Sequence, residues 1–123
     1  AMGINQLGHV VGNAQDAAGI NLPFLHDGQA MAALPACDAR ETHVYDINNH
    51  DQVVGASFTD QFDGRRAILI DGGQCYPLQS LLDESGAGWV LSLAHAINDD
   101  GTIVGTGEFE GVVRGFVATR VTP

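Results

Sequence analysis

Ile4–Gly12, with the sequence INQLGHVVG, is the first of three related stretches that decide the fold. The stretch returns as INNHDQVVG at Ile47–Gly55 and as INDDGTIVG at Ile97–Gly105. Four of the nine positions are identical in all three copies, and the seventh is always aliphatic. Self-similarity at this spacing is the signature of a repeat architecture, so the chain is predicted to consist of three tandem units.

The pattern Asn-x-x-Gly between apolar residues predicts a tight β-hairpin in each copy. The Asn side chain can hydrogen-bond the turn backbone, and Gly supplies a left-handed residue. Asp replaces this Gly in the second copy, and Asp is one of the few other residues that tolerate the conformation. The predicted turn residues are Asn5, Gly8, Asn48, Asp51, Asn98 and Gly101.

A second block, with an aliphatic strand and a following Asp-Gly turn, comes after the first two nonamers, and its first half comes after the third. Each repeat therefore reads as about four short antiparallel strands, with repeats at about 1–36, 42–78 and 90–123. In the middle repeat the strands are expected at 42–47, 52–58, 66–70 and 74–78. Leucines spaced among polar residues predict one short helical turn near 79–84.

These features predict a single all-β domain of three propeller-blade-like repeats. A pseudo-threefold β-barrel or prism is the alternative, because about 40 residues per unit suits those folds as well. Unpaired strands at the ends of the repeats also predict self-association through sheet edges, since exposed edges readily pair with other chains.

The composition excludes several classes of partner. The chain has 15 acidic residues, five arginines and a net charge of −10, which disfavours nucleic acid and anionic membrane surfaces. Apolar residues make up 45% of the sequence, but no apolar run reaches the roughly 20 residues of a membrane-spanning helix. No nucleic-acid partner and no membrane insertion are therefore expected.

The repeats resemble the bacterial HAF-type extracellular repeat, in which an I-N-x-x-G-x-V-V-G hairpin precedes an A-F-L-W-like strand and a D-G turn. The similarity is closest over 78–123, where a leucine pair and a Ser-Gly-Trp-like element precede the last Ile-Asn hairpin. This part is similar to the C-terminal end of such proteins. The resemblance implies a protein that is secreted or held at the bacterial cell surface or in the periplasm, with blade-like β-units.

Cys37 and Cys75 are the only cysteines. In an exported protein they are a candidate disulfide, and in the cytosol they would be two free thiols. Their spacing in the sequence does not decide between these alternatives.

Neither catalytic residues nor metal ligands nor a cofactor are predicted. Histidines occur without zinc-site spacing, and the oxygen-rich turns at 48–51 and 98–101 lack a complete calcium ligand set. Asp60 and Asp63, on either side of Phe62, could form a glycosidase carboxylate pair, but a solvated acidic loop is the expected explanation for them.

Aromatic residues near strand ends offer the best indication of function. Phe58, Phe62, Trp89 and Phe109 are predicted to lie where they can stack on a sugar ring or anchor a protein partner. The function expected from the sequence is a non-catalytic recognition module for a glycan or a protein. A purely structural repeat domain is the first alternative, and a hydrolase that uses acidic residues is the second.

Overall fold

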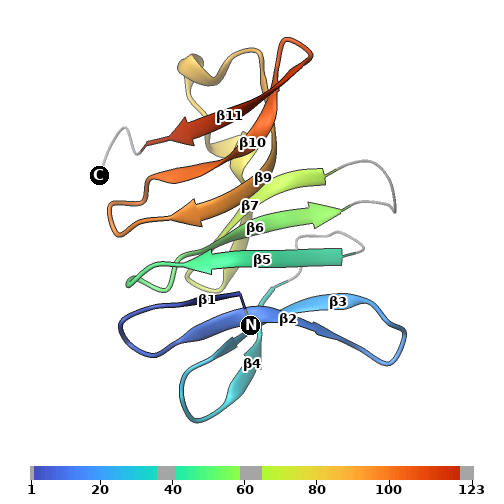
Figure 1. The fold of residues 1–123 in the computed structure, drawn as a ribbon, viewed down its shortest axis with the longest axis vertical. Helices are drawn as coiled ribbons and strands as arrows, with labels where there is room; N and C mark the ends of the chain where they lie inside the picture. Colours follow the sequence, from blue (N-terminus) through green and yellow to red (C-terminus); the bar gives the residue numbers. More distant parts are fainter. Residues whose placement is uncertain (1, 36–40, 59–64, 120–123) are drawn as a thin grey trace.

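The computed structural model describes residues 2–35, 41–58 and 65–119, which form three antiparallel β-sheets (Figure 1). The first sheet contains β1 (Gly3–Ile4), β2 (Val10–Gln15), β3 (Asn21–His26) and β4 (Met31–Ala33). The second contains β5 (Glu41–Ile47), β6 (Val53–Phe58), β7 (Arg65–Asp71) and β8 (Gln74–Pro77). The third contains β9 (Trp89–Ile97), β10 (Ile103–Phe109) and β11 (Val112–Ala118). The predicted all-β class is confirmed.

Strands that follow one another in the chain are neighbours within each sheet, in the orders β1-β2-β3-β4, β5-β6-β7-β8 and β11-β10-β9. The three sheets follow one another along the long axis of the molecule, with β5 against β2 and β3, and β9 against β6 and β7 (Figure 1). Among the described residues the third sheet has three strands, fewer than the expected four. No helix of the described part is long and apolar enough to cross a membrane.

All three nonamers form the same hairpin turn. The N–H of the fifth residue donates to the carbonyl of the Asn over 3.1–3.2 Å. Asp51 has a φ of 57°, and the glycines at the same position have φ values of 80° and 84°. The Asn Oδ1 atom accepts hydrogen bonds from the N–H groups two and four residues later at 2.9–3.0 Å. The turn is therefore shaped by its own Asn side chain.

The glycine that ends each of the last two nonamers lies opposite a β-bulge. Tyr45 and His95 are the extra residues of these bulges, and their rings are 6.2 Å apart. A Cβ atom on Gly55 would collide with the carbonyl oxygen of His43, and one on Gly105 would collide with that of Leu93. These glycines are required because another backbone passes too close for any side chain.

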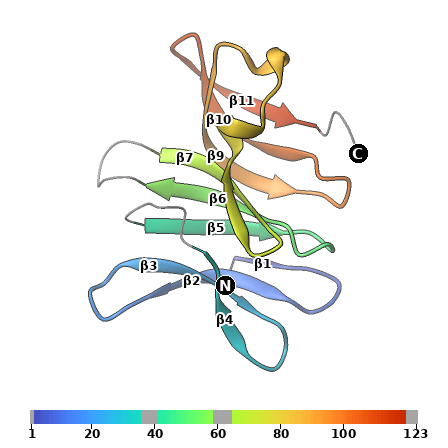
Figure 2. The ribbon, with the colours of Figure 1, turned by 180° about the vertical axis from the view of Figure 1, so that it is seen from behind.

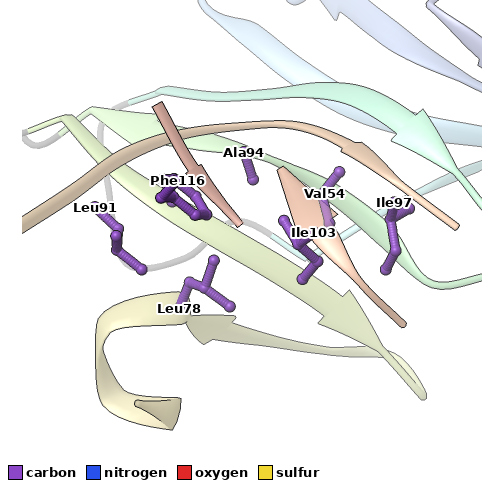
Figure 3. Close-up of a cluster of buried hydrophobic side chains, with 8 residues drawn as sticks. Val54, Leu78, Leu91, Ala94, Ile97, Ile103 and Phe116 are labelled. Carbon is purple, nitrogen blue, oxygen red and sulfur yellow. The ribbon is translucent and has the colours of Figure 1, made fainter. Parts of the chain in front are cut away.

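Apolar side chains fill the two spaces between the sheets. Val11 of the first sheet packs against a cluster from the second sheet: Val44, Ile47, Val53, Ile68 and Ile70. On its other face the second sheet meets the third, and Figure 3 shows the residues of this cluster, which include Val54, Leu78, Leu91, Ala94, Ile97, Ile103 and Phe116. The core is therefore two layers between sheets, and no single sheet could bury these side chains alone.

Hydrogen bonds also join the three turns to one another. The Nδ2 group of Asn5 donates to the carbonyl of Asn48 at 2.9 Å, and the Nδ2 group of Asn48 donates to the carbonyl of Asn98 at 2.9 Å. One residue further on, Gln6 N–H donates to Asn49 Oδ1 at 2.7 Å, and Asn49 N–H donates to the Asp99 carboxylate at 2.8 Å. We call these bonds, made at residues 5–6, 48–49 and 98–99, the turn ladder.

The helical turn expected near 79–84 is present as two short 3₁₀ segments, η1 (Leu78–Leu81) and η2 (Glu84–Gly86). The Asp83 side chain caps η2 by accepting from the N–H of Ser85. Figure 2 shows this connection, in gold, between β8 and the strands of the third sheet. Its first segment, η1, contacts β7 and β8 of the second sheet and β9 of the third.

Cys75 lies on β8, where it packs half-buried against the first core cluster and is disulfide-bonded. Cys37 lies outside the described residues, so the predicted pairing of these two cysteines stays a prediction.

We expect Gly55→Ala and Gly105→Ala each to lower the free energy of unfolding by about 2–3 kcal/mol, because the added methyl group must displace backbone. Denaturant-induced unfolding measures the change. Gly115→Ala is the matched control, since its nearest atom is 3.7 Å away and Ala67 occupies the equivalent register position in the second sheet. Equal effects at all three positions would contradict the bulge explanation.

The turn ladder predicts unequal effects of two Asn→Ala substitutions. Asn48→Ala removes two hydrogen bonds inside the turn and two that its amide donates, and we expect a loss of about 3 kcal/mol. Asn98→Ala removes only the two bonds inside its own turn, and we expect about 1 kcal/mol. Thermal unfolding in dilute solution checks both values. Losses of the same size would show that the bonds between turns contribute nothing.

Candidate functional site

A cleft of about 650 Å³ opens between the second and third sheets, next to η1 and η2. Its floor is apolar and is made by Leu78, Leu91, Ile103 and Phe116, all of them buried. Figure 3 shows Leu78, from η1, on the opposite side of the space from the other three. The cleft is thus a place where the core between two sheets is only partly covered.

Gln79 holds the segment that lines one side of the cleft. Its side-chain Nε2 donates to the carbonyl of Trp89 at 2.8 Å, and its Oε1 accepts from the N–H of Leu91 at 2.9 Å. β9 is an edge strand of its sheet, so the Gln79 amide supplies bonds that a neighbouring strand would otherwise supply. This clamp keeps Leu78 directed into the cleft floor.

The aromatic side of the cleft is formed by Trp89, whereas Phe109 is not among the residues that line the cleft. Trp89 lines the cleft and is half-buried, and its ring lies 5.3 Å from that of Phe109 and 6.4 Å from that of Phe116. Two of the four aromatic residues predicted as ligand contacts, Trp89 and Phe109, are therefore in contact with each other. Phe58 lies at the end of β6, where its ring meets His43 edge-on at 5.0 Å. Phe62 lies outside the described residues.

Polar groups lie around this apolar floor. Gln52 is buried and connects the turn ladder to the cleft, because its Oε1 accepts from Asn48 at 2.7 Å and its Nε2 donates to Asp71 at 3.1 Å. Asp83 accepts from the N–H of Ser85 at 2.9 Å and from its hydroxyl at 2.6 Å. The two carboxylates can accept hydrogen bonds from the hydroxyl groups of a ligand.

The hydrogen bonds from the hydroxyl and N–H of Ser85 hold the pKa of Asp83 below its ordinary value. A general acid in a glycosidase needs the opposite, a raised pKa that keeps the proton near neutral pH. Asp83 is therefore a hydrogen-bond acceptor in this cleft and not a proton donor. Asp60 and Asp63, the carboxylate pair considered from the sequence, lie outside the described residues.

The oxygen atoms of the turns at 48–51 and 98–101 are used by the turns themselves. Asn48 and Asn98 each accept two backbone N–H bonds, and Asp51 accepts from Asn5 Nδ2 at 2.7 Å and lies 2.9 Å from His9 Nδ1. Within the described ranges, no three histidine, cysteine or acidic residues come together in a way that suits a metal ion. The turn residues thus serve the contacts between sheets.

Sequence reasoning missed the cleft because its residues come from two different repeats and from the connection between them. No sequence pattern marks Gln52 or Gln79 as a cleft residue, since each is held by a hydrogen bond to a residue of a strand further along the chain. The available signals were the helical turn near 79–84, which identifies the connection but not what it covers, and Trp89, which lines the cleft.

Comparison of the chain with protein-family models, with curated proteins and with solved structures found no match.

The lowered pKa of Asp83 can be measured directly by NMR titration of its carboxyl carbon. We expect a midpoint below 3.8, and Ser85→Ala should raise it because the substitution removes the hydroxyl donor while the backbone N–H remains. Asp27 is a suitable comparison carboxylate, since backbone N–H bonds from Gln29 and Ala30 lower its pKa without a hydroxyl donor. A midpoint above 3.8 would make Asp83 a candidate acid and would reopen the hydrolase alternative.

Proposed function

We propose that the protein is a non-catalytic recognition module that binds its ligand in the cleft between the second and third sheets. The observation that carries this proposal is an apolar cleft of about 650 Å³ beside Trp89, edged by a few hydrogen-bonding groups. Clefts of this size, mostly apolar with a small number of placed polar groups, are the usual form of a binding site for a small molecule.

The ligand class that fits best is a neutral saccharide. A sugar ring has an apolar face that packs on aromatic and aliphatic side chains, and it has hydroxyl groups that donate to carboxylates. Trp89 and the leucines supply the first kind of contact, while Asp71 and Asp83 supply the second. The net charge of −10 disfavours an acidic glycan.

In this proposal the three sheets are blades of a HAF-type repeat protein at its C-terminal end, secreted or held at the bacterial surface or in the periplasm. The support is the thrice-repeated Ile-Asn hairpin together with the pair of cysteines, which suits an oxidising compartment. The packing of successive sheets face to face is the arrangement that neighbouring propeller blades adopt.

A purely structural repeat domain is the second candidate. The turn ladder favours it, because the most regular polar side chains of the motif are occupied in joining sheets. The two candidates differ in one respect: only a recognition module binds a ligand in the cleft.

A screen against an array of neutral glycans, followed by calorimetric titration of any that bind, tests the proposal. We expect Leu81→Ala and Asp71→Asn each to weaken binding about tenfold, a loss of about 1.4 kcal/mol, because each removes a cleft contact. Leu7→Ala is the matched control, since Leu7 is as exposed as Leu81 but lies in the first hairpin, away from the cleft.

Binding that Leu7→Ala leaves unchanged and that both cleft variants weaken would support the proposal. Two results would reject it: the unaltered chain binds no glycan, or it binds a glycan with an affinity that neither cleft variant changes. The first of these would leave the structural candidate as the better account.

A further inference from the structure

The second sheet has one face toward the preceding sheet and one toward the following sheet. In the described part of the chain, the first sheet has nothing on its preceding face and the third has nothing on its following face. We call these the head face and the tail face. Strand alternation places Ile4, Val10, Leu22, Phe24 and Met31 on the head face. It places Val90, Val104, Val113 and Val117 on the tail face.

Head-face residues are more exposed than their equivalents in the second and third sheets. Ile4 is 67% exposed, whereas Ile47 is 4% and Ile97 is 7% exposed. The strand register shows the equivalence, because each of these isoleucines pairs with the seventh residue of its own nonamer. In the second and third sheets this face is covered by the sheet before it. The head face therefore carries the same kind of apolar residues as the faces that another sheet covers.

The tail face shows the complementary pattern. Val11, Val54 and Val104 occupy the same position of the three nonamers, yet the first two are fully buried and Val104 is 39% exposed. Val117, which pairs with Val104, is 68% exposed, whereas Leu69, which pairs with Val54, packs against the core. Seven of the eleven large apolar side chains exposed in the described residues lie on the head and tail faces.

The turn ladder is also open at its two ends. The amides of Asn5 and Asn48 each donate to the Asn carbonyl of the next turn. Asn98 Nδ2 has no acceptor among the described residues, and the Asn5 carbonyl accepts only the N–H of Gly8. The third turn thus offers the Asn98 amide as a donor, and the first turn offers the Asn5 carbonyl as an acceptor. These are the same two groups that join successive turns within the chain.

We propose that the tail face of one chain covers the head face of a second copy of the same chain. The contact repeats the interface seen twice within the chain, with Val104 and Val117 meeting Ile4 and Phe24, and with Asn98 donating to the partner's turn. The occupant is a second copy because the two faces differ from each other and each matches a face that the chain itself covers. A contact between unlike faces is heterologous, so it must close into a ring or continue as a filament.

Sedimentation velocity over a series of protein concentrations, at physiological salt to screen the like charges, tests this assembly. We expect particles of at least twice the chain mass of 12.9 kDa, growing in proportion as the protein concentration rises. Ile4→Asp and Val117→Asp should each raise the dissociation constant about a hundredfold, because each buries a carboxylate in an apolar contact. Val112→Asp is the matched control, since Val112 is exposed on β11 but on the opposite face from Val117.

Dissociation of both face variants, together with association of the Val112→Asp control, would support the contact between tail face and head face. A chain that stays monomeric at all concentrations would overturn it, as would a dimer that resists both variants. A dimer sensitive to only one variant would indicate contact between like faces and would also overturn it. Circular dichroism of each monomeric variant shows that a loss of association is not a loss of fold.

Discussion

The carboxamide of the motif Asn is the group on which the rest of the structure depends. Its oxygen closes the hairpin by accepting two backbone N–H groups, and in Asn5 and Asn48 its nitrogen reaches the carbonyl of the following turn. One side chain therefore defines the local turn and the distance between sheets at the same time. Asn has a short side chain with separate acceptor and donor atoms, which explains why it is identical in the three copies while the two residues that follow it vary.

Much of the fold follows from the sequence because its determinants are local. The Asn-x-x-Gly pattern predicts each hairpin, and the strands of the middle repeat, expected at 42–47, 52–58, 66–70 and 74–78, lie within two residues of their observed bounds. The sequence does not show which constraint requires Gly at positions 55 and 105, since a strand bulge and a close backbone approach both require a missing side chain. The bulges themselves show that Tyr45 and His95 are equivalent, a relation that the histidine spacing alone conceals.

The cleft was beyond the reach of the sequence for a physical reason. Its floor and walls come from strands of two sheets and from the connection between them, so no single stretch of the sequence contains the residues that form it. Trp89 was identified as a candidate contact because it is aromatic and precedes a strand, and Phe109 for a similar reason. Their contact depends on the register of β9 against β10, in which Trp89 and Phe109 are paired. Gln79 is the clearest example of a residue whose role the sequence does not indicate. Its side-chain amide makes two hydrogen bonds to the backbone of β9 that a neighbouring strand would ordinarily make.

The unequal spacing of the three turns has a consequence for how such a protein can change over evolutionary time. Asn5 and Asn48 are 43 residues apart, whereas Asn48 and Asn98 are 50 apart, yet the two ladder bonds have the same length of 2.9 Å. The stacking of the turns is thus insensitive to the length of the chain that leads from one sheet to the next. Insertions and deletions in these connections can therefore change the surface between two sheets while the stacked turns keep their geometry.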